Sequence, residues 1–145
     1  MAEQFEQVTL NLTNDKVQFT GVSKSNPTRP IIFDFRPPIG DGQGYNGLEV
    51  LLMSLAGCSG TTIVYLLRKM DKNISGLRVK AKGIRRDRPP FGFEKIGLEF
   101  ILTSDDTRNE DIQKAIQLAE ASVSPVWQMV KNNVEVTTGY KIVVS

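Results

Sequence analysis

The chain has a single cysteine, Cys58, and no histidine. A thiolate is a strong nucleophile that reacts with peroxides and disulfides. With one cysteine and no histidine, the chain forms no intrachain disulfide, no Cys–His catalytic pair and no zinc site of the usual Cys/His type. Cys58 is therefore the best candidate nucleophile, and the alternative is a small buried side chain with a structural role only.

Cys58 stands within a long segment that has the spacing of an apolar helix. Leucines and other apolar residues recur every three or four positions between Gly47 and about Met70. This pattern predicts an α-helix of about 24 residues, roughly 36 Å long. Asn46 and Glu49 have the spacing of a capping box at its start.

Two features of this predicted helix indicate close packing. Gly57 and Gly60 would each lower helix stability by about 1 kcal/mol relative to alanine, so we expect another backbone close by or room for a ligand. Apolar residues cover most of the circumference, and the helix is long for a monomer of this size. We therefore expect it to pack against a second subunit in a homodimer.

Outside this helix, apolar and polar residues mostly alternate, which is the period of a β-strand. Asn109 is expected to cap a second helix, and Pro125 is expected to begin a short third helix. The helices are grouped rather than alternating singly with strands, so the order βββ-α-ββ-αα-β predicts the α+β class in one domain, residues 1–145. The predicted strands are residues 7–13, 17–21, 31–35, 77–83, 96–102 and 134–144.

Charge limits the classes of partner and ligand. The formal net charge of +2 is too small to indicate a nucleic-acid-binding protein. Five basic residues nevertheless lie between Lys80 and Arg88; a solvated strand end accounts for them, and anion binding is the alternative. No metal or other cofactor is expected, because Asp105, Asp106 and Asp111 lie near a helix start, where capping explains them.

The location of the protein is predicted from its ends and its cysteine. The acidic, polar N-terminal residues do not resemble a signal peptide, and a single free cysteine suits a reducing cytoplasm. The run from Leu48 to Leu67 has one charge, Glu49, but polar and small residues interrupt it. We expect a buried helix there and no membrane span.

Two segments of the chain match known sequence motifs. Residues 44–58, GYNGLEVLLMSLAGC, are similar to G-x-N-P-x-E-L-L-L-x-S-L-A-G-C. Residues 115–126, AIQLAEASVSPV, are similar to A-x-x-L-A-E-x-x-Y-C-P-V. Both motifs belong to the OsmC/Ohr family, the osmotically inducible protein C-like and organic hydroperoxide resistance proteins. Element order and length also agree, so the chain resembles this family along its whole length.

The resemblance implies a fold and a reaction. The fold has antiparallel sheets around a long central helix, in an intertwined dimer with two active sites at the subunit interface. The reaction is thiol peroxidase activity on organic hydroperoxides, in which a thiolate attacks the O–O bond and becomes a sulfenic acid. A second cysteine then forms a disulfide, which an external dithiol reduces. The attacking residue of the family corresponds to Cys58.

The position of the second family cysteine is occupied by Ser124. A serine hydroxyl cannot convert a sulfenic acid into a disulfide, so the two-cysteine cycle is closed to this chain. Three explanations remain open: an external thiol resolves Cys58, the peroxidase activity is weak or lost, or the serine was introduced on purpose.

Gly47, where many relatives have proline, is a second departure from the family, and activation of the thiol is the third. Ohr-type members lower the pKa of the thiol with an arginine from the N-terminal hairpin, which a glutamate near the helix start holds. Here Glu49 stands where OsmC-type sequences have their glutamate, although it also suits the capping box. No arginine precedes Arg29. Lys16 is the nearest basic residue to the expected place, or an ordinary solvated lysine, and Arg29 and Arg36 are further candidates.

Two functions follow from these observations. The first is a thiol peroxidase in which Cys58 reduces organic hydroperoxides and depends on an outside thiol. The second is a non-catalytic protein that binds a small apolar ligand at the dimer interface. Ser124 favours the second, and Cys58 within an intact Leu-Ala-Gly-Cys motif favours the first.

Overall fold

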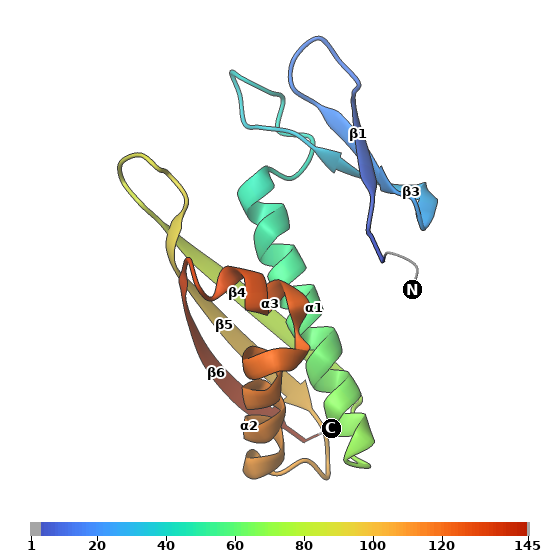
Figure 1. Ribbon diagram of the computed structural model, residues 1–145, viewed down its shortest axis with the longest axis vertical. Coiled ribbons are helices and arrows are strands. Elements are labelled where there is room, and N and C mark those ends of the chain that lie inside the picture. Colours follow the sequence, from blue (N-terminus) through green and yellow to red (C-terminus); the bar gives the residue numbers. More distant parts are fainter. Residues whose placement is uncertain (1–3, 145) are drawn as a thin grey trace. The chain divides into compact units, whose positions relative to one another are not determined.

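The computed structural model describes residues 4–144 and contains two compact units. The first unit ends at Val50 and the second begins at Leu51, so each is described by itself. The long helix α1 (Gly47–Lys69) has its first turn in the first unit and the rest in the second (Figure 1). The element order is the predicted βββ-α-ββ-αα-β, with one addition between the last two helices.

The first unit is a three-stranded antiparallel sheet. Its strands are β1 (Val8–Leu12), β2 (Phe19–Ser23) and β3 (Asn26–Phe33), in the order β1-β2-β3. The third strand was expected over residues 31–35, but it begins five residues earlier and Phe35 lies beyond it. Prolines at 27 and 30 obscure the strand in the sequence, yet an edge strand tolerates a residue without an amide hydrogen.

The apolar side chains of β1 remain largely uncovered. Val8, Leu10 and Leu12 share one face of the strand and are 66%, 42% and 54% exposed. The period of two is therefore present as predicted, but among the described residues of this unit the apolar face of the sheet has no cover. A contiguous exposed apolar face of this kind marks a place where another surface binds.

The buried carboxylate of Asp34 organises the loop between β3 and α1. It accepts hydrogen bonds from the backbone amides of Phe35 at 2.8 Å, Gln43 at 3.0 Å and Asp41 at 3.2 Å. Gly40 is required beside it, because a Cβ there would collide with the carboxylate and with the Phe35 carbonyl. The hydrogen bond from Gln43 is the main cause that lowers the pKa of Asp34.

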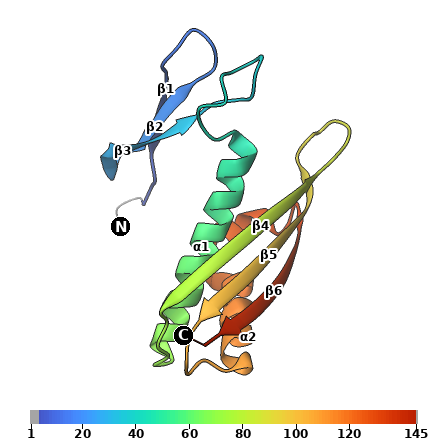
Figure 2. The same ribbon diagram turned by 180° about the vertical axis from the view of Figure 1, so that it is seen from behind.

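The second unit packs helices on one face of a three-stranded sheet. In Figure 1 the helices lie in front of the sheet, and in Figure 2 the sheet lies in front of α1 and α2. The core is made by Leu55, Ile63 and Leu67 of α1 together with alternate side chains of the central strand and apolar residues of α2. The elements are β4 (Gly76–Arg85), β5 (Phe93–Thr103), α2 (Asn109–Leu118), a π-helix (Ala119–Val123), α3 (Pro125–Val130) and β6 (Glu135–Val143).

Strand pairing differs in one place from the antiparallel sheets that the family resemblance implied. β4 and β5 are antiparallel, but β5 and β6 run parallel, with Lys95 opposite Glu135 at the start and Thr103 opposite Val143 at the end. The reason is the connection, since α2 and α3 lie between these two strands and a crossover of that length returns the chain in the same direction.

The two glycines of α1 have different surroundings. A Cβ at Gly60 would lie 3.2 Å from Val79 Cγ2, so Gly60 allows the helix to approach β4 closely. A Cβ at Gly57 would meet no described heavy atom within 4 Å. Close packing therefore explains Gly60, whereas Gly57 faces open space.

The helix ends are fixed by side chains. The predicted capping box of α1 is present, with the Glu49 amide donating to Asn46 Oδ1 at 2.9 Å and the Asn46 amide donating to Glu49 Oε1 at 3.0 Å. The second helix is capped at Arg108 rather than at Asn109, because the Arg108 amide donates to Asp111 Oδ2 at 2.9 Å. Asp106 was expected to cap a helix, but its carboxylate accepts a hydrogen bond from the backbone amide of Asn73.

By length and composition, α1 would be able to cross a membrane. Such a helix is weak evidence for a membrane span, because the core helix of a soluble protein has the same properties. Six of its residues are buried, and they include Leu55, Ile63 and Leu67 in the core.

The Asp34 contacts predict a pH-dependent contribution to stability. The pKa of Asp34 is lower when folded than when unfolded, so its contribution is present above the unfolded pKa of about 4 and is lost as pH falls through the folded pKa. We expect Asp34→Asn to lower the thermal midpoint at pH 7 and to have little effect near pH 2. Asp15→Asn, which removes an exposed carboxylate, is the matched control. An equal loss at both pH values would contradict this assignment.

Candidate functional site

Cys58 lies in the middle of α1 and is half-buried. The hydroxyl groups beside it on the helix do not donate hydrogen bonds to the thiol, because each donates to a backbone carbonyl four residues earlier. Ser59 donates to Leu55 at 2.6 Å and Thr62 donates to the carbonyl of Cys58 itself at 2.9 Å. These bonds satisfy the hydroxyl groups locally.

The structure brings Ser124 into contact with Cys58. The Ser124 hydroxyl donates a hydrogen bond to Cys58 Sγ across 3.3 Å, and the serine side chain is fully buried. The two positions are 66 residues apart in sequence and come from α1 and from the start of α3. The family resemblance related these two positions through the disulfide of the two-cysteine cycle, and the fold brings them into contact.

Local backbone structure holds Ser124 in this position. A π-helix of five residues, Ala119–Val123, separates α2 from Ser124, and Pro125 opens α3 immediately after it. The Ser124 amide donates to the Ala119 carbonyl at 3.1 Å, and the Ser124 carbonyl accepts from the Gln128 amide at 3.0 Å. The serine is therefore anchored on both sides. Short π-helices occur frequently at functional sites, but no residue pattern in this sequence revealed it.

Two large apolar residues, Trp127 and Met129, follow Ser124 in α3. Trp127 is completely buried and stacks on Phe100 with ring centroids 6.5 Å apart, so its main contacts are with the core. Its indole nitrogen has no hydrogen-bond partner among residues 4–144. Met129 is 68% exposed. Core packing therefore accounts for Trp127 without a pocket.

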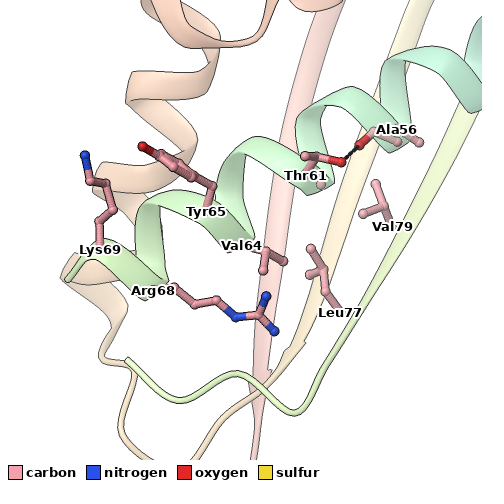
Figure 3. A pocket seen from close by; sticks show the side chains of 10 residues that line it. Ala56, Thr61, Val64, Tyr65, Arg68, Lys69, Leu77 and Val79 are labelled. Carbon is pink, nitrogen blue, oxygen red and sulfur yellow. Dashed lines mark hydrogen bonds between the residues drawn. The ribbon is translucent and has the colours of Figure 1, made fainter. Parts of the chain in front are cut away.

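A groove of about 870 Å³ runs between α1 and β4 (Figure 3). Its apolar wall is made by Val64, Leu77 and Val79, and Gly57 leaves part of it open. In Figure 3 the Arg68 guanidinium extends along one side, whereas Tyr65 and Lys69 lie on another, with the ammonium 5.2 Å from the ring centroid. Within the described chain, the groove-lining residues do not include Cys58.

The remaining predicted site residues, Glu49 and Lys16, belong to the first unit. Glu49 occupies the capping box of α1. Lys16 Nζ lies 2.6 Å from Asp41 Oδ1. This hydrogen bond, together with the attraction of the same carboxylate, raises the pKa of Lys16. Lys16 is therefore a paired cation rather than an isolated turn lysine. Roles for Glu49 and Lys16 in activating Cys58 stay predictions.

Carboxylates and the thiol do not gather into a metal site in the described part of the chain. Residues 4–144 contain no group of three or more His, Cys, Asp or Glu side chains placed to hold a metal ion.

Asp34 is a residue that organises the loop before α1, and the sequence analysis did not identify it. An aspartate between a strand and a glycine-rich loop was the available signal, because such side chains bind the amides of turns.

Comparison with known proteins places this geometry in a family. The family model for OsmC-like protein matches residues 40–139. Protein YhfA of Escherichia coli strain K12 is 30% identical over 96 residues, which are 66% of this chain and 72% of YhfA. This similarity is between the two amino-acid sequences and does not involve their structures.

Solved structures agree in fold. The OsmC-like protein from Mycoplasma pneumoniae has a TM-score of 0.82 at 21% identity and covers 98% of this chain and 99% of its own. The organic hydroperoxide resistance protein OhrB of Bacillus subtilis has a TM-score of 0.64 at 18% identity, with coverage of 95% and 98%. At these identities the structures show a shared α+β fold, while the family model and the YhfA match show descent. The chain belongs to the OsmC-like protein family.

Proposed function

We propose that this chain is a stress-response protein of thiol peroxidase ancestry, with Cys58 as the residue that attacks organic hydroperoxides. The contact between Ser124 Oγ and Cys58 Sγ, at 3.3 Å, carries the proposal. It places the position of the second family cysteine against the only thiol in the chain. The name of the Bacillus subtilis OhrB protein supports the choice of substrate class.

The reaction proceeds by displacement at oxygen. The Cys58 thiolate attacks the terminal oxygen of R–O–OH, the O–O bond breaks, and the alkoxide leaves as R–OH after taking a proton from water. The product is a Cys58 sulfenic acid. An external thiol then attacks the sulfenic sulfur, releasing water and forming a mixed disulfide, and a second thiol returns Cys58 to its reduced form.

Ser124 supports only part of this cycle. Its hydroxyl donates a hydrogen bond to the sulfur and holds the sulfur beside Ser124. The same hydroxyl is unable to form a disulfide, so reduction depends on an outside thiol or dithiol. Glu49 and Lys16 enter the proposal as the glutamate and the cation that the family resemblance assigns to activation of the thiol.

The alternative function is binding without turnover. The groove between α1 and β4 favours it, because about 870 Å³ with an apolar wall is a volume typical of small-ligand sites. In this reading Cys58 is a half-buried side chain and the groove takes a small apolar molecule at a subunit interface.

A homodimer is part of both functions. Two apolar surfaces lack a cover in the described chain: the Val8, Leu10 and Leu12 face of β1, and the side of α1 that carries Leu51 and Tyr65, which are 40% and 53% exposed. Burial of such surfaces provides the main driving force for subunit association. We infer that a second copy covers them and that the protein acts in the cytoplasm, without binding nucleic acid or membranes.

Sulfenic acid formation is the test of the first function. Purified protein is treated with one equivalent of cumene hydroperoxide in the presence of dimedone, and the intact mass is measured over time. We expect one adduct, on Cys58, forming faster than with hydrogen peroxide. Ser124→Ala removes the hydrogen bond and should slow it by roughly tenfold, the effect of about 1.4 kcal/mol.

Cys58→Ser is the control for this experiment and should stay unmodified. An unchanged mass of the natural chain at low peroxide would reject the peroxidase function and leave the ligand-binding one.

Substitution of Ser124 by cysteine should open the two-cysteine cycle. The serine oxygen already lies in contact with the thiol, so a sulfur at the same position is within reach after a small rotation. We expect Ser124→Cys to lose two hydrogens and form a disulfide between Cys58 and the introduced cysteine after one equivalent of peroxide, seen by peptide mass spectrometry. Ser122→Cys, on the exposed part of the π-helix, is the matched control. Equal disulfide yields from both variants would contradict the geometry.

Subunit association is tested on β1. Leu10→Lys places a charge on the uncovered apolar face, and we expect it to convert a dimer to a monomer in sedimentation velocity. Thr9→Lys adds the same charge on the neighbouring position, which points to the opposite face of the strand. A natural chain that sediments as a monomer, or a dimer that both variants leave intact, would reject this interface.

A further inference from the structure

The outer face of the second sheet presents a row of basic side chains. Side chains alternate along β4, so Leu77, Val79 and Ala81 contribute to the core while the residues between them lie on the opposite face. The five basic residues between Lys80 and Arg88 therefore do not form one cluster. Lys80 and Lys82 belong to β4 and lie on the face of the sheet that no helix of this unit covers (Figure 2).

This face is hollowed between the strands. A depression of about 580 Å³ lies across β4, β5 and β6, which is within the size range of small-ligand sites. Lys80 and Lys82 border it from β4, and Lys141 borders it from β6. The hydroxyl-bearing Thr137 and the carboxylate of Glu99 are its other polar side chains on this face.

Two glycines create the hollow, and the fold itself gives no reason for either. A Cβ at Gly139 would meet no described heavy atom within 4 Å, and one at Gly97 would make only an ordinary contact of 3.6 Å with Thr137. Both lie inside strands without a positive φ. Glycine weakens a strand interior and often marks a place where a ligand approaches the backbone. Gly83 is the contrast, because the ring of Phe93 fills the space beside it.

The charges around the hollow are unbalanced. Three lysines and one glutamate give a local formal charge of +2, and none of these lysines forms an ion pair within residues 4–144. Lys80 stands opposite Glu99, as Lys95 stands beside Glu135, whereas Lys82 and Lys141 stand opposite Gly97 and Ile101 and have no carboxylate directly across from them. A phosphate monoester carries about −1.5 to −2 charges at pH 7 and suits such a cluster.

We propose that the depression over Gly97 and Gly139 binds the phosphate group of a small molecule, held by Lys80, Lys82 and Lys141. The hollow lets a phosphate approach the strand backbone, and Thr137 adds a hydroxyl donor. An extended nucleic acid fits less well, because the outward-facing residues of the three described strands include no aromatic side chain on which bases stack.

Pyrophosphate titration of ¹⁵N-labelled protein, at an ionic strength held constant with sodium chloride, tests the proposal. We expect saturable shifts of the amides of Gly97 and of residues 137–141. The double variant Lys80→Gln, Lys82→Gln should weaken binding by about tenfold or more, since each lysine makes a charge-assisted contact. Lys95→Gln, on the same face outside the hollow, should change it by less than about twofold.

Gly139→Thr separates binding from folding. Threonine favours strands, so the thermal midpoint should stay the same or rise, whereas its side chain fills the hollow and should abolish the pyrophosphate shifts. A stable Gly139→Thr variant that binds as before would overturn the proposal. The proposal would also be overturned if pyrophosphate caused amide shifts no larger than those caused by sodium chloride alone. The same holds if Lys95→Gln weakened pyrophosphate binding as much as the double variant does.

Further arms of the titration identify the source of the phosphate. Adenosine 5′-monophosphate that binds more tightly than pyrophosphate would indicate a phosphate ester, and the reverse order an inorganic anion; both support the site. Tighter binding of a single-stranded RNA oligonucleotide, with a steep dependence on salt, would replace the small-molecule proposal by a polymer-binding one. Every variant leaves Cys58 and Ser124 untouched, so the outcome is independent of the peroxidase test.

Discussion

The packing of α1 on the inner face of the second sheet determines the rest of the site. Leu55, Ile63 and Leu67 are fully buried, and they fix the rotation of the helix about its axis. With 3.6 residues per turn, successive side chains are about 100° apart. Cys58 therefore lies at the edge of the buried stripe, one position from the buried Ser59. Its half-burial and its contact with Ser124 are consequences of that packing rather than separate features.

Much of this arrangement was predictable because local signals agreed with the global fold. The capping box at Asn46 and the apolar spacing of α1 depend on neighbours within a few residues, which a sequence displays directly. The resemblance to family motifs added the pairing of positions 58 and 124, which periodicity alone does not give. The order of elements followed from the alternation of apolar residues in the strands.

The features that escaped prediction depend on tertiary context. The parallel pairing of β5 with β6 follows from where the crossover returns, and no residue pattern in the sequence marks the π-helix before Ser124. The early start of β3 depends on its edge position, which the sequence does not show. Arg108 replaces Asn109 as the cap because Asp111 accepts its amide hydrogen. Asp34 was missed because its three amide partners are brought together only by the folded loop.

Trp127 gives the protein an optical property that bears on its study. It is the only tryptophan in the chain, and it lies fully buried against Phe100, three residues after Ser124. Indole emission shifts to shorter wavelength in an apolar environment, and the fully buried ring of Trp127 lies in one. Tryptophan emission, excited selectively, therefore reports on α3, and a movement that admits water beside Trp127 will appear as a red shift.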